Sequence, residues 1–208
     1  MTDAGVEGNS RLTAVTGAVL FVLLAIEGWT IPQVRPYLTL HVFVGVLLVG
    51  PILLKIGATG YRFIRYYARA DPYVRRGPPH PVLRVLGPLV ILSSLVVLAS
   101  GIALILVGRG SAAQDWLITT HQASFIVWIV VTSVHVLGHV RDTVIGIGSE
   151  LRDSGSAAVK NRRRTKRALL IALALLAGTG LAIGLTPLAS SWSRGDAGRH
   201  IHYHVQTP

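Results

Sequence analysis

Residues 116–139, WLITTHQASFIVWIVVTSVHVLGH, are almost wholly apolar and yet contain His121, His135 and His139. A stretch of this length can cross a bilayer, which takes about 20 apolar residues in an α-helix. His121 and His135 are separated by about four helical turns, so their side chains lie on one face of the helix at different depths. His139 follows on that face one turn further along. Because an ionisable side chain is costly inside a membrane span, these histidines are candidates for function.

The composition of the chain indicates an integral membrane protein. Of its 208 residues, 51% are hydrophobic and only 14% are charged, and the mean hydropathy is +0.55. Cysteine is absent, which excludes disulfides, thiolate-bound iron–sulfur clusters and haem attached through a Cys-x-x-Cys-His motif. A metal cofactor in this chain must therefore be bound by histidine, carboxylate or other ligands without a thiol.

Apolar runs along the chain predict an all-α integral membrane protein with five transmembrane helices. The runs cover residues 12–31, 37–58, 82–107, 116–139 and 168–185. The chain divides accordingly into four parts. These are a four-helix bundle over 1–140, a basic connector over 141–167, the fifth transmembrane helix over 168–188 and a histidine-rich tail over 189–208.

The distribution of Lys and Arg predicts a multi-pass protein of the plasma membrane with a defined orientation. Most basic residues fall between the second and third spans or in the connector, where 160–167 read KNRRRTKR. By the positive-inside rule the N-terminus is cytoplasmic and the C-terminal tail is extracytoplasmic. Residues 1–11 lack the basic start of a signal peptide, so we expect the first span to remain as an anchor. Because the connector adjoins span ends, topology and anionic-lipid contact are favoured over nucleic-acid binding.

With this orientation, the candidate residues inside the spans fall at two depths. His41 on the second span and His121 on the fourth both lie a few residues below the outer surface. Neutral imidazoles on facing helices are the usual axial ligands of a low-spin b-type haem, so this pair predicts a haem site at the outer level. The inner level contains His80, His135, His139 and Lys55, which follows His41 at the spacing that separates His135 from His121.

The first four spans, residues 12–140, resemble the membrane b-type cytochromes, in which four helices hold haem b between histidines. The resemblance rests on His41, His121 and His135, with Gly45 and Gly50 as small residues beside a macrocycle. It implies one haem b between His41 and His121. It also implies a second haem at the inner level, with His135 as one ligand and with His80 or His139 nearby. The chain departs from the family at Lys55, where those proteins have a second histidine on the second span.

Two groups of charged side chains each have two interpretations. Arg62, Arg65 and Arg84 lie near the loop between the second and third spans. They either pair with the propionates of an inner haem or form an ordinary positive-inside loop. Glu27 lies in apolar surroundings near the outer level. It either accepts a proton from a quinol or meets water or Arg35 at the interface.

The fifth span and the tail lie outside the resemblance. Gly180 and Gly184 form a small-xxx-small pair, which suits contact between helices. In the tail, RHIHYHVQTP, three histidines alternate along the chain and would share one face of an extended strand. We expect them either to dock as a strand onto a partner or to bind Zn²⁺ or Cu²⁺. They are His200, His202 and His204.

Two functions from different classes remain open. The first is an electron-transfer subunit of an oxidoreductase, which exchanges electrons between a quinone and a redox partner through haem b within the lipid bilayer. The sequence contains no flavin or nicotinamide fingerprint, so a complete reductase would need another chain. The second is a haem-free membrane module that anchors or assembles a partner or moves a metal ion, with histidines lining the path.

Overall fold

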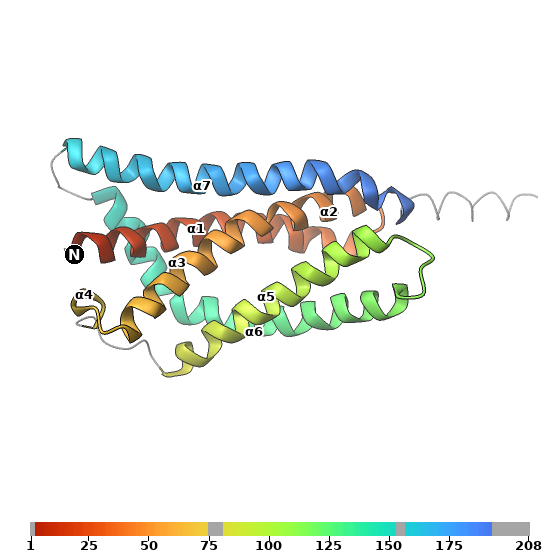
Figure 1. The fold of residues 1–208 in the computed structure, drawn as a ribbon, viewed down its shortest axis with the longest axis horizontal. Coiled ribbons are helices and arrows are strands. Elements are labelled where there is room, and N and C mark those ends of the chain that lie inside the picture. The colour runs from red at the N-terminus through yellow and green to blue at the C-terminus, as the bar shows by residue number, and fades with distance from the viewer. Residues whose placement is uncertain (1–2, 75–80, 153–156, 193–208) are drawn as a thin grey trace, which may run out of the picture.

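The structure is a computed structural model, and it describes residues 3–74, 81–152 and 157–192 (Figure 1). Every regular element in these residues is helical, which confirms the all-α prediction. The long helices run side by side as one elongated bundle. In chain order the elements are α1 (Asp3–Thr30), η1 (Ile31–Gln33), α2 (Leu38–Leu47), α3 (Val49–Tyr67), α4 (Asp71–Val74), α5 (Pro81–Val107), α6 (Gln114–Arg152), α7 (Ala157–Leu185) and η2 (Thr186–Ala189).

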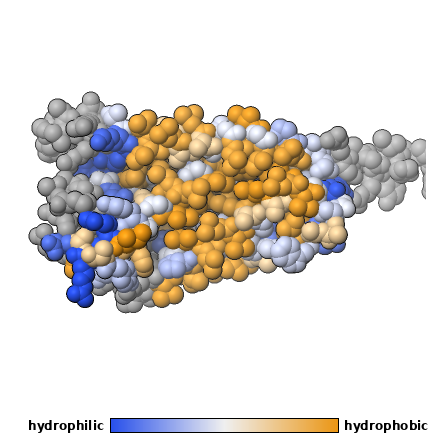
Figure 2. Space-filling view, viewed as in Figure 1, coloured by the Kyte–Doolittle hydropathy of each residue, from blue (hydrophilic) through white to orange (hydrophobic). Residues whose placement is uncertain are grey.

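Five helical segments are long and apolar enough to cross a membrane, as the sequence predicts. Their middle portions form a continuous apolar belt, and hydrophilic residues gather at the end of the bundle that contains α4 (Figure 2). Large side chains such as Ile126 and Leu176 are well exposed in the middle of their segments, which suits contact with lipid because lipid tails are as apolar as leucine. The segments are Gly8–Gln33, Leu38–Tyr67, Val85–Val107, Gln114–Gly138 and Arg164–Trp192.

Most of the connector predicted over 141–167 is helical. α6 continues through Arg152 and α7 begins at Ala157, so both helices extend beyond their apolar segments. Arg, Lys and Glu have good helix propensity, and neither helix contains a proline that would end it earlier. The basic residues of the connector therefore belong mainly to helix extensions.

The second span is broken after Leu47, where α2 ends and α3 begins. Pro51 explains the break, because proline has no N–H to donate to the carbonyl four residues earlier, which is that of Leu47. That carbonyl lies against Gly178 of α7, so closely that a Cβ atom on Gly178 would overlap it. A Cβ atom on Gly50 would likewise overlap the carbonyl of Ala174. The broken span and the fifth span are therefore in backbone-to-backbone contact.

A stripe of small residues on α7, Ala174, Gly178 and Ala182, makes this contact possible. Ala182 is completely buried, and residues of this size at intervals of about one turn let membrane helices approach closely. Gly180 and Gly184, which the sequence favoured, are not part of the contact, since a Cβ atom on either would meet nothing within 4 Å. That prediction was wrong because small residues occur on two faces of this helix and the spacing alone does not distinguish them.

The other long helices are joined by apolar packing and by two hydrogen bonds between helices. α5 and α6 pack against each other along much of their length, and α1 contacts α2, α3 and α6. Trp128 on α6 is buried and donates a hydrogen bond of 2.9 Å from Nε1 to Oγ of Ser94 on α5. Asn9 on α1 donates one of 3.0 Å to the carbonyl of Ala58 on α3. These polar ties join helix pairs whose other contacts are mainly apolar.

Candidate functional site

The structure brings His41 of α2 and His121 of α6 together. Their ring centroids lie 6.4 Å apart and the ring planes are inclined at 82°. The two helices are not principal packing neighbours, since α2 packs on α1, α5 and α7 while α6 packs on α5 and α1. The two rings therefore approach each other from helices on different sides of the bundle interior.

The surroundings of His41 determine which of its ring nitrogens carries the proton. Nδ1 lies 3.0 Å from Oε1 of Glu27 and 3.0 Å from Oγ1 of Thr30. The Thr30 hydroxyl donates its own hydrogen to the Glu27 backbone carbonyl, at 2.6 Å, so it can only accept from His41. Both contacts are satisfied together when Nδ1 is the donor, which leaves Nε2 with its lone pair in the neutral ring.

The same reasoning applies to His121, although its partners are neutral. Nδ1 lies 3.1 Å from the backbone carbonyl of Val97 and 3.1 Å from Oγ of Ser100. A carbonyl only accepts, so Nδ1 again carries the proton and Nε2 has the lone pair. Within the described part of the chain, the hydrogen bonds to both histidine rings end on Nδ1.

Two glycines leave room for this arrangement. A Cβ atom on Gly101 of α5 would lie 3.1 Å from Cε1 of His121, and one on Gly45 of α2 would lie 3.1 Å from Oε1 of Glu27. Both distances are shorter than ordinary van der Waals contact. Gly45 is thus placed beside the carboxylate that contacts His41, whereas Gly50, which the sequence also assigned to the surroundings of a macrocycle, lies at the contact with α7.

The separation of the two rings matches that of two axial ligands on one metal ion. Two imidazole nitrogens on opposite sides of an ion, each at about 2 Å from it, place the ring centroids roughly 6 Å apart. The observed separation is 6.4 Å. Metal-binding histidines almost always donate their other N–H to a carboxylate or a backbone carbonyl, which fixes the tautomer and the ring orientation. His41 and His121 show both kinds of partner, so the residues present fit a bis-histidine haem.

The part of the chain that the structure describes contains no group of three His, Asp or Glu side chains arranged to hold a bare metal ion. Glu27 is close to His41, but its oxygen contacts Nδ1 and not the nitrogen that the tautomer leaves for a metal. At the outer level, the atoms available to a metal are therefore the Nε2 atoms of His41 and His121, and each ring is hydrogen-bonded to a different helix.

Lys55 lies on the same side of the second span as His41, as the spacing predicts. Its ammonium donates a hydrogen bond of 2.7 Å to the backbone carbonyl of Thr13 on α1, the helix that also supports His41. A Cβ atom on Gly17 would lie only 2.8 Å from Nζ. The lysine therefore fills the space that this glycine leaves and supplies a polar contact between α3 and α1.

The inner level is described only in part. His135 is half-buried on α6, and Arg62 and Arg65 are half-buried on α3. His80 and the tail residues His200, His202 and His204 lie outside the described residues, as do the side chains of His139 and Arg84. The pairing of His135 and the roles of these arginines stay predictions.

Several polar residues at the site were not singled out in the sequence. Thr30 and Ser100 support the two histidines, and Trp128 lies seven residues from both His121 and His135. A seven-residue spacing corresponds to about two turns and the same helix face. Two features of the sequence could have indicated these residues. One is this spacing, and the other is the set of serines in α5, since hydroxyls in an apolar span bond back to the helix carbonyls or to a neighbouring helix. Ser93, Ser94 and Ser100 are all buried.

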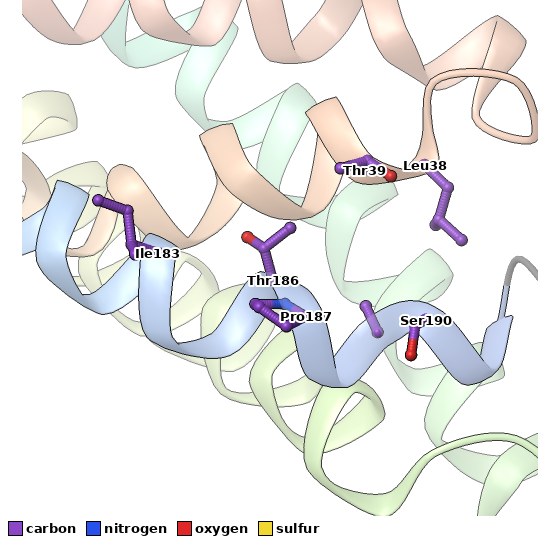
Figure 3. A pocket seen from close by; sticks show the side chains of 7 residues that line it. Leu38, Thr39, Ile183, Thr186, Pro187 and Ser190 are labelled. Carbon is purple, nitrogen blue, oxygen red and sulfur yellow. The ribbon is translucent and has the colours of Figure 1, made fainter.

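A pocket of about 340 Å³ lies between the start of α2 and the end of α7 (Figure 3). Thr186 points across it toward α2, and its Oγ1 is buried without a hydrogen-bond partner in the described structure. The lining is a mixture of apolar side chains and hydroxyls. It consists of Leu38, Thr39, Ile183, Thr186, Pro187, Ala189 and Ser190.

No protein-family model, curated protein or solved structure matches this chain. The assignment of a function consequently depends on the geometry of the site and on the pattern of the sequence.

Proposed function

We propose that this protein is a membrane electron-transfer protein that binds haem b between His41 and His121. The observation that carries the proposal is that both rings have the same tautomer, with the proton on Nδ1. Each ring donates its Nδ1–H to a neighbouring helix, which leaves each Nε2 available to iron, and the centroid separation of 6.4 Å suits a shared ion.

In this proposal the chain supplies ligands, support and exclusion of water, while the haem supplies one-electron redox chemistry when bound. Glu27 and Thr30 orient His41, and Val97 and Ser100 orient His121. Gly101 allows the His121 ring to lie against α5. The site lies inside a helical bundle with an apolar belt, and burial of this kind is one of the means by which a protein tunes a haem potential.

The electron partners that we propose are a quinone in the bilayer and another redox subunit. The positive-inside pattern supports a plasma-membrane location with the N-terminus in the cytoplasm and the C-terminus outside. In that orientation the histidine pair is near the extracytoplasmic surface. An exchange partner on that side, or a quinone at that depth, would then approach the haem edge.

A second haem at the inner level remains part of the proposal, with His135 as one ligand. Haem-to-protein stoichiometry tests it. A ratio of one haem per chain that does not change in His80→Ala and His135→Ala would reject the inner site, and Lys55 would then serve as the polar contact to α1 that its bond to Thr13 suggests.

The test of the outer site is a reduced-minus-oxidised visible spectrum of the protein purified from membranes. We expect sharp b-type bands in the wild type, and their loss or a high-spin spectrum in His41→Ala and in His121→Ala, with membrane insertion retained. Gln122→Ala is the matched control, since Gln122 follows His121 on the same helix and is exposed. A wild type without haem bands would leave the haem-free membrane module as the function.

A further inference from the structure

The hydrogen-bond partners of the two histidines differ in charge. His41 has a carboxylate at 3.0 Å from Nδ1, whereas His121 has a backbone carbonyl and a serine hydroxyl, each at 3.1 Å. Glu27 is largely buried, with a side chain 15% exposed. Two axial ligands of one chemical type are thus set in unequal electrostatic surroundings.

The end of α1 explains how the carboxylate reaches His41. Glu27 and Thr30 are three residues apart in the last turn of α1, so their side chains share a face. Pro32 then ends the helix within η1 (Ile31–Gln33), and the chain returns through a short turn to α2. Both side chains consequently face the first turns of α2, where His41 lies.

The direction of the hydrogen bond identifies Glu27 as an acceptor. The Thr30 hydroxyl is committed to the Glu27 backbone carbonyl, so the ring N–H is the hydrogen shared between Nδ1 and its two partners. A carboxylate that accepts from an imidazole ligand makes the ligand more basic. A more basic ligand and a nearby negative charge both favour the oxidised, more positive form of an iron centre.

We infer that Glu27 is a positioning residue that holds His41 for iron and lowers the midpoint potential of the outer haem. This inference rests on the proposed haem site. It gives Glu27 a role different from that of a proton acceptor for quinol, because its Oε1 is engaged by His41. It also makes His41, not His121, the axial ligand through which the protein sets the potential.

The test is a redox titration of the purified haem protein and of Glu27→Gln, which keeps the size and an acceptor oxygen but removes the charge. We expect the haem to be retained with low-spin bands and the midpoint potential to rise. Asp115→Asn is the matched control, since it removes a negative charge from an exposed residue in the first turn of α6 and should shift the potential little. An unchanged potential in Glu27→Gln, or an equal rise in Asp115→Asn, would overturn the inference while leaving the haem site intact.

A second variant and a second measurement cover the case in which Glu27→Gln does not assemble. Gly45→Ala places a Cβ atom about where it would press on Oε1 of Glu27, so it should also raise the potential without changing any charge. In haem-free protein, ¹⁵N NMR should show His41 protonated on Nδ1 in the wild type. A wild-type His41 protonated on Nε2 or an unchanged potential in Gly45→Ala would count against Glu27. Absence of haem from the wild type would instead reject the proposed function.

Discussion

The imidazole planes of His41 and His121 are inclined at 82° to one another. Each ring is oriented by partners on a helix other than its own. Glu27 at the end of α1 holds His41, and the carbonyl of Val97 on α5 holds His121. The positions of α1 and α5 therefore help to set the angle between the two planes.

This angle predicts the electron paramagnetic resonance spectrum of the oxidised protein. When two axial imidazole planes are parallel, they split the two iron d orbitals that interact with them, and when the planes are perpendicular these effects cancel. If haem is bound as we propose, we expect a strongly anisotropic low-spin signal from it. A rhombic spectrum with closely spaced features would show that the planes are nearly parallel in the haem-bound protein.

Gly101→Val should weaken haem binding by displacing His121. A Cβ atom at this position would lie 3.1 Å from Cε1 of the ring, and overpacking of this kind costs about 1–3 kcal/mol, or roughly 5- to 150-fold in affinity. Haem-to-protein ratio and haem titration provide the measurement. Gly57→Val on α3 is the matched control, because a Cβ atom there would meet nothing within 4 Å. Equal haem loss in both variants would mean that only helix propensity is being measured.

Gly178→Ala should destabilise the bundle by separating α7 from the break after Leu47. The added Cβ atom would overlap the Leu47 carbonyl, and the expected cost is about 1–3 kcal/mol in the free energy of unfolding. Thermal or denaturant unfolding in detergent measures it. Gly180→Ala, whose Cβ atom would meet nothing within 4 Å, should instead be neutral or stabilise by up to about 1 kcal/mol. The reverse order of the two variants would place the helix contact on the other face of α7.

The hydrogen bond between Trp128 and Ser94 should couple α5 to α6. Trp128→Phe and Ser94→Ala each remove one partner of the 2.9 Å bond, and a double-mutant cycle isolates their interaction. Measured bonds between membrane helices lead us to expect a coupling of about 0.5–1.5 kcal/mol in the free energy of unfolding. Additive effects of the two substitutions would show that the bond contributes nothing to stability.

Reporter fusions should show an extracytoplasmic C-terminus and a cytoplasmic connector. A reporter that is active only outside the cytoplasm should function after Pro208, and one that is active only inside should function near Gly155. The motivation is the excess of Lys and Arg in the connector and after the second span. The opposite pattern would invert the depth of every residue, and His41 and His121 would then lie near the cytoplasmic surface.

Hydropathy and helical period predicted the five spans, and they placed His41 and Lys55 on one side of the second span and His121 and His135 on one face of the fourth. Both signals are local, because burial in lipid depends on runs of apolar residues and a helix repeats every 3.6 residues. A haem-binding role for the outer pair was also an expectation from sequence, and it remains a proposal. What the pattern of one helix does not contain is the rotation of that helix against its neighbours.

The rotation of each helix against its neighbours decided which groups contact the two histidines. Glu27 faces His41, and Val97 faces His121, because α1 and α5 are turned so that these atoms meet the rings. Similarly, the contact on α7 is made by Gly178 because Pro51 frees the Leu47 carbonyl opposite it. Each of these contacts joins residues that are distant in the chain, and each is selected by close packing and hydrogen-bond satisfaction between helices, which only the tertiary structure determines.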